Sequence, residues 1–192
     1  MSTNSSVNNW LSFYEISLES YWGLIENRRN YNKTLMVSPD HRTRRKMWIQ
    51  SMTAIVFSIT AIEAYLNYRA ELILDSSPLQ WNELERVSTE EKFYLVYSLS
   101  MGDNRRLKEI GLSHFKRSLR LRNSIIHQKY SNKTAISRRP RDWVEWAATS
   151  VRAAHWILSI IPRDIGRFHF IEPIPHWKYE NKFIEPVSPS PI

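Results

Sequence analysis

Residues 44–74 read RRKMWIQSMTAIVFSITAIEAYLNYRAELIL. The apolar side chains of this stretch recur every three or four residues, which is the period of one face of an α-helix. The core stripe consists of Met52, Ile55, Ile59, Ile62 and Leu66. A second set lies roughly opposite and indicates a second packing surface, against a neighbouring helix or a second subunit. This set consists of Phe57, Ala61, Ala64 and Tyr68. The stretch therefore predicts one long core helix.

The composition of the whole chain agrees with a helical fold. Only four of its 192 residues are glycine, too few for the turns of a β-sandwich or a doubly wound sheet. Hydrophobic residues make up 42% of the chain and aromatic residues 12%, which is enough for a core. We expect an all-α protein, an up-down bundle of four to five main helices in residues 1–162.

Four further helices are predicted around the core helix. They cover residues 6–30, 88–101, 105–131 and 143–161. Ser88 supplies a hydroxyl cap with acids in the following turn, and Asp142 caps the last helix. Gly111 either lies within its helix or breaks it, so that the helix begins near Ser113.

The last thirty residues differ from the rest of the chain. Residues 163–192 hold five prolines with aromatic residues between them. Proline excludes a long helix, and the aromatic residues argue against a purely solvated tail. We expect an extended Pro-rich arm that packs across the bundle or across a second subunit.

The charge and the absence of cysteine restrict the classes of partner and compartment. Lys and Arg outnumber Asp and Glu by 27 to 19, and a net charge of +8 favours a polyanion. The basic run HRTRRK, residues 41–46, is either a solvated helix start or a polyanion contact. Without cysteine or an N-terminal secretory pattern, the chain is expected in the cytoplasm. Polar residues interrupt the apolar run 48–66, so we expect a buried helix and no membrane partner.

A second informative stretch, FKRSLRLRNSIIHQKY, covers residues 115–130. On a helical wheel, apolar side chains lie on both sides of Arg122, which places this arginine in the middle of the apolar face. A guanidinium stays charged in a protein, so it needs a partner, a ligand or a cleft there. Glu63, beside the stripe of the core helix, is the expected partner. Its role is either structural or to orient Arg122.

Residues Arg122 and His127 are the sharpest candidates for chemistry. The chain has no glycine-rich phosphate loop, and its six histidines are too scattered for metal-ligand spacing, so we expect neither a cofactor nor a metal site. A histidine can take or give a proton near neutral pH. An arginine can hold a phosphate and stabilise the charge that builds on it. Together they are a minimal set for cleaving RNA through its own 2′-hydroxyl.

The spacing of this pair poses a geometric problem. Residues five apart differ by about 140° on an ideal helix, so Arg122 and His127 do not converge within one straight helix. A kink, the reach of the arginine, or a cleft between two copies of the helix would bring them together. A two-fold dimer would supply both a general acid and a general base. Asn123 and His127 share a flank of the helix through their i, i+4 spacing, next to Lys116 and Arg120.

At these residues the chain resembles the HEPN superfamily of helical domains. The likeness consists of Arg122, four spacers and His127, with Asn123 directly after the arginine. The segment TAIEAYLN, residues 60–67, is similar to a core-helix pattern of some HEPN subgroups, and so is EEKF, residues 90–93. The likeness covers residues 48–161. One toxin subgroup has a tyrosine two residues after the histidine, where this chain has Lys129.

The resemblance implies a homodimer across the motif helices that cleaves RNA without a metal. Such domains are often toxins or effectors of bacterial toxin–antitoxin or antiphage systems, so RNA and an antitoxin or other regulatory protein are expected partners. By position, Arg122 would bind the scissile phosphate, His127 would perform acid–base catalysis, and Asn123 would orient the substrate or His127. The basic candidates for substrate contacts are Lys116, Arg120 and Lys129. The alternative is a non-catalytic basic helical module that binds nucleic acid or a partner protein.

Overall fold

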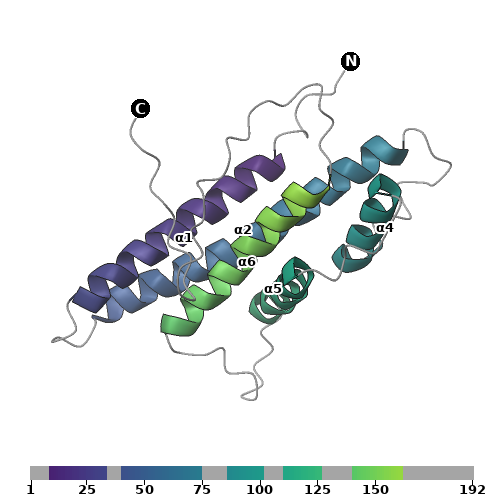
Figure 1. Cartoon of the computed structure of the whole chain (residues 1–192). Coiled ribbons are helices and arrows are strands. Elements are labelled where there is room, and N and C mark those ends of the chain that lie inside the picture. Colours follow the sequence, from purple (N-terminus) through teal and green to yellow (C-terminus); the bar gives the residue numbers. More distant parts are fainter. Residues whose placement is uncertain (1–8, 34–39, 75–85, 102–109, 127–139, 162–192) are drawn as a thin grey trace. The chain divides into compact units, whose positions relative to one another are not determined.

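The computed structural model describes residues 9–33, 40–74, 86–101, 110–126 and 140–161 (Figure 1). These residues form five α-helices. They are α1 (Asn9–Lys33), α2 (His41–Leu74), α4 (Thr89–Met101), α5 (Ile110–Ile126) and α6 (Pro140–Ile160). This part of the chain holds no strand, so the predicted all-α class and the number of main helices are confirmed. The predicted arm, residues 163–192, lies outside the described residues.

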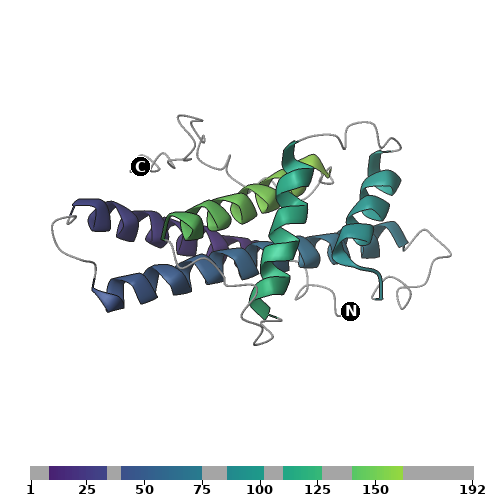
Figure 2. The same cartoon turned by 90° about the horizontal axis from the view of Figure 1, so that it is seen from below.

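Helices α1, α2 and α6 lie side by side (Figures 1 and 2). Asn27 near the end of α1 donates a hydrogen bond to Gln50 near the start of α2 (2.9 Å), so these two helices are antiparallel. Helix α6 runs in the same direction as α2. Ser51 Oγ donates to the carbonyl of Trp143 (2.8 Å) at one end of the pair, and Tyr65 Oη donates to the carbonyl of Ile161 (3.2 Å) at the other.

Helices α4 and α5 run across this layer (Figure 2). Near its start, α5 packs closely against α6, because a Cβ atom added to Gly111 would overlap the indole of Trp156. Further along, α5 reaches α2 through an ion pair between Arg122 and Glu63. The chain thus places the motif helix across the bundle, with its last turns beyond the contact with α6.

Four of the five residues of the predicted core stripe of α2 are in the core, whereas Met52 is half-buried. Ile55, Ile59, Ile62 and Leu66 are completely buried, and each such side chain contributes about 1.5–3 kcal/mol through burial. The predicted second surface packs against a neighbouring helix, because Phe57 contacts Phe13 of α1 with ring centroids 5.9 Å apart. Contacts on both faces explain why α2 is central to the bundle.

Within the described residues, α2 is the one helix whose length and apolar composition would allow it to cross a membrane. Half of its most apolar window is buried inside the bundle. A core helix of a soluble protein passes the same test of length and composition, so this observation is weak evidence for a membrane span.

Two helix starts, those of α2 and α6, differ from the prediction for identifiable reasons. Helix α2 begins at His41, three residues early, because Asp40 caps it: the Arg42 amide donates to Asp40 Oδ1 and the Arg44 amide to the Asp40 carbonyl. Helix α6 begins at Pro140, a residue suited to the first helical position because it lacks an N–H. Asp142 therefore lies in the first turn of α6, and the prediction that it caps this helix is wrong. Helix α5 begins at Ile110 and includes Gly111 in its first turn.

Candidate functional site

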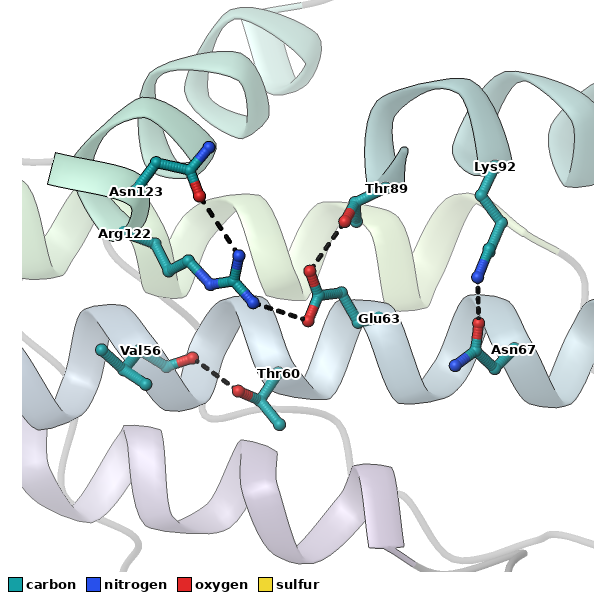
Figure 3. A network of polar contacts seen from close by, with 8 residues as sticks. All are labelled: Val56, Thr60, Glu63, Asn67, Thr89, Lys92, Arg122 and Asn123. Carbon is teal, nitrogen blue, oxygen red and sulfur yellow. Dashed lines mark hydrogen bonds and ion pairs between the residues drawn. The ribbon is translucent and has the colours of Figure 1, made fainter. Parts of the chain in front are cut away.

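The ion pair predicted between Arg122 and Glu63 is present in the structure (Figure 3). Arg122 Nη2 lies 3.2 Å from Glu63 Oε2, and the two side chains are 26% and 28% exposed. Two residues that face the bundle precede this contact at helical spacing: Phe115 and Ser118 are fully buried, and Arg122 follows on the same stripe. The guanidinium therefore lies where the apolar face of α5 meets the surface of the protein.

Glu63 is shared between two helices other than its own. While Oε2 binds Arg122, Oε1 accepts a hydrogen bond from Thr89 Oγ1 at 2.7 Å. Thr89 is the first residue of α4, and its position is set by a capping box. Ser88 Oγ accepts from the Glu91 amide (3.3 Å), and the Glu91 carboxylate accepts from the Ser88 amide (3.1 Å). One carboxylate thus joins α2, α4 and α5.

A second polar contact lies one turn further along α2. Lys92 Nζ donates to Asn67 Oδ1 at 2.6 Å, and Lys92 is 8% exposed (Figure 3). Sequence reasoning missed the roles of Thr89 and Lys92. The i, i+4 spacing of Glu63 and Asn67 beside an apolar stripe was the available signal, because two polar groups on a core helix need partners.

Asn123 holds the guanidinium of its neighbour in sequence. Arg122 Nη1 donates to Asn123 Oδ1 at 3.1 Å, and Asn123 is exposed. Arg122 Nε is buried and has no hydrogen-bond partner among the described residues. The two observed bonds orient the guanidinium and leave one N–H on each Nη nitrogen for a ligand, whereas the buried Nε is not accessible. His127 and Lys129 lie outside the described residues.

The two basic candidates that the structure describes have different surroundings. Lys116 forms a salt bridge with Glu90 of α4 (2.8 Å) and lies 5.6 Å above the centre of the Tyr94 ring. The hydrogen bond with Glu90 raises the pKa of Lys116. Arg120 is exposed on the same flank as Asn123. A phosphate that approaches this flank would reach Arg120 directly, whereas Lys116 would first have to leave Glu90.

No group of three or more His, Asp or Glu side chains within the described ranges is arranged to hold a metal ion. Comparison with known proteins gives no match: no family model, no curated protein and no solved structure matches this chain. Function is therefore inferred from the residues and their geometry.

Proposed function

We propose that the protein is a metal-independent endoribonuclease of the HEPN type, with an active site shared between two copies of the chain. The observation that carries the proposal is the setting of Arg122. Its guanidinium stands at the exposed end of α5, is oriented by Glu63 and Asn123, and keeps donors for a phosphate. A cation that is already held in one orientation loses little further side-chain entropy when it binds a phosphodiester.

In the proposed reaction, Arg122 binds the scissile phosphate and Glu63 positions Arg122. His127 takes the proton of the 2′-hydroxyl, and the 2′-oxygen attacks the phosphorus atom. The guanidinium stabilises the charge on the phosphorane. The bond from phosphorus to the 5′-oxygen then breaks, and a protonated His127 of the partner subunit gives its proton to the leaving oxygen. The products are a 2′,3′-cyclic phosphate and a 5′-hydroxyl.

A shared site follows from helix geometry. Arg122 and His127 are five residues apart, which corresponds to about 140° on a straight helix. Ile126, which follows Arg122 on the bundle-facing stripe of α5, is 51% exposed. An exposed aliphatic residue beside the site supports contact with a second copy of α5. In a two-fold dimer, each arginine would face the histidine of the other chain.

The cellular role that fits this chemistry is a cytoplasmic toxin or effector of a toxin–antitoxin or antiphage system, with an antitoxin or other regulatory protein as partner. This part of the proposal rests on the resemblance to the HEPN superfamily.

The test is cleavage of a labelled RNA in excess chelator by the parent protein, Arg122→Ala and His127→Ala. We expect cleavage by the parent with 2′,3′-cyclic phosphate ends, and at least a hundredfold loss in both variants, since acid–base groups and charge stabilisation each contribute about this much. Arg86→Ala is the matched control for Arg122→Ala, because Arg86 is exposed and distant in sequence from α5. Cleavage that survives Arg122→Ala and His127→Ala removes the site, and cleavage lost with chelator removes the mechanism.

One observation favours a second candidate, a non-catalytic basic module that binds nucleic acid or a partner protein. Glu63 joins three helices through Arg122 and Thr89, so Arg122 has a structural use that needs no substrate. Under this alternative, the parent binds RNA without cutting it. Arg122→Ala would then lower the melting temperature, and neither the parent nor this variant would cleave RNA.

A further inference from the structure

Basic side chains lie on the turns where α1 finishes and α2 begins. They also lie on the first turn of α6, which begins further along α2, close to Ser51 (Figures 1 and 2). We call this cluster the basic end. It consists of Arg28 and Arg29 of α1, Arg42, Arg44, Arg45 and Lys46 of α2, and Arg141 of α6. Among the described residues of these turns, three acids stand against seven cations, namely Glu26, Asp40 and Asp142. These turns therefore carry a strong excess of positive charge.

Like charges are close together at this end. Burial lowers the pKa of Arg28, and the neighbouring charge of Arg141 lowers it further. Arg42, Arg45 and Lys46 are all exposed and follow one another at i, i+3 and i+4, which places them on one side of α2. Repulsion between gathered cations raises the free energy of the empty surface, and a bound polyanion would relieve it.

The dipole of α2 makes the gathered cations at its start still less favourable. No acidic residue lies in its first turn, where the helix dipole favours negative charge and opposes cations. Asp40 satisfies the Arg42 amide as a cap, but the four cations that follow remain at the positive end of the dipole. An anion bound here would be favoured both by the side chains and by the helix.

The chemistry of the basic end favours a phosphodiester backbone over a membrane surface. Six of its seven cations are arginines, whose planar guanidinium binds phosphate through two hydrogen bonds. A helix that lies on a membrane needs a broad exposed apolar face. In α2 that face is used for the core, where Met47 is fully buried, and Ile49 is the large aliphatic residue left exposed near this end.

We propose that the basic end binds the sugar–phosphate backbone of RNA at a surface separate from Arg122. Eighteen residues of one helix separate Arg45 from Glu63, a distance of about 27 Å at about 1.5 Å per residue. A stacked strand with a phosphate every 3.4 Å or so would need about eight nucleotides to reach both places. The choice of RNA over DNA rests on the proposed function, whereas binding at the basic end requires no cleavage.

The test compares two double variants with equal loss of charge, both made on Arg122→Ala so that the RNA stays intact. Arg42→Gln with Arg45→Gln removes two cations from the basic end, and Arg86→Gln with Arg117→Gln removes two from elsewhere. Binding of a labelled 20-nucleotide single-stranded RNA is measured from 0.05 to 0.5 M salt. Each phosphate contact contributes about −0.7 to the slope of log affinity against log salt. The basic-end variant should therefore lose about 1.4 of that slope and bind about tenfold more weakly at 0.15 M salt.

Thermal melting shows whether a variant has lost RNA binding because it is unfolded. Removing cations from the start of α2 should leave the melting temperature unchanged or raise it, because those charges oppose the helix dipole. Equal RNA affinity of the two double variants overturns the proposal. If the basic-end variant no longer binds phosphatidylserine vesicles but still binds RNA as the control variant does, the proposal is also overturned, and a membrane surface is favoured.

The outcome is independent of catalysis. A parent protein that binds RNA through the basic end but never cuts it would refute the proposed function and leave this inference standing. A parent protein that cuts RNA, while both double variants bind it equally, would refute this inference alone.

Discussion

The two halves of α5 are attached to the bundle in different ways. The first half is packed: Gly111 lies against the Trp156 ring, and Phe115 is fully buried with an edge contact to Phe93 at 5.4 Å. The second half is held by polar contacts of Arg122, while Ser124 and Ile126 are exposed. Close packing fixes a helix in place, whereas an oriented cation at the surface remains able to bind. The first half therefore serves as the anchor of the second.

The largest expected difference in unfolding free energy is between Phe115→Ala and Ile126→Ala. Removing the buried ring leaves a cavity and should cost about 3–5 kcal/mol of unfolding free energy. Truncating the exposed aliphatic should change it by less than about 0.5 kcal/mol. Urea denaturation at low micromolar protein concentration measures both. Similar costs for the two variants would show that the last turn of α5 is packed as firmly as the first.

The next comparison concerns the first and last turns of α5. In Gly111→Ala the new methyl group overlaps the indole of Trp156, which should cost about 1–3 kcal/mol despite the better helix propensity of alanine. Ser124→Ala should be neutral or stabilise by up to about 0.5 kcal/mol, because its hydroxyl bonds only the Arg120 carbonyl of its own helix. Thermal and urea unfolding of both variants are the measurements. A neutral Gly111→Ala would mean that Trp156 moves freely.

A smaller effect is expected for the ion pair that joins the second half of α5 to α2. A double-mutant cycle of Glu63→Ala and Arg122→Ala should give a coupling energy of about 1 kcal/mol. Both side chains are partly exposed, so solvent weakens their attraction without removing it. Thr89→Val, which removes the other hydrogen bond of Glu63, should cost about 1 kcal/mol on its own. A coupling of zero would indicate that Asn123 alone orients Arg122.

The smallest effect is a pH dependence from the packed half of α5. Burial lowers the pKa of His114 in the folded protein, and the charges of Arg152 and Arg117 lower it further. The unfolded chain then binds more protons than the folded one near the ordinary histidine pKa of about 6.5, so the stability contribution is present above that pH and is lost as pH falls below it. Melting temperatures at pH 7.5 and 5.5 should therefore differ less in His114→Gln than in the parent.

Ser124→Ala is the control for that measurement, because Ser124 is exposed on the same helix and has no group that titrates in this pH range. It should leave the pH dependence as in the parent. A parent protein that becomes more stable at pH 5.5 through His114 would contradict the sign of the shift.

The sequence by itself determined the helices and the ion pair. The three-to-four-residue period of α2 marks its buried face, because that pattern depends only on neighbours along one helix. A guanidinium on the apolar face of α5 required a counter-charge, and Glu63 was identifiable as a carboxylate beside a core stripe. The capping box of α4 was readable for the same reason, since its partners are three residues apart.

The tertiary structure decided what depends on segments far apart in the chain. The fit of Gly111 against Trp156, the parallel course of α2 and α6, and the bond from Thr89 to Glu63 have no local signature, because each depends on how distant helices pack. The basic end has the same origin. The cations of residues 41–46 were visible as a run, but only the packing of the helices brings Arg28 of α1 and Arg141 of α6 together, beside the turn of α2 that follows this run.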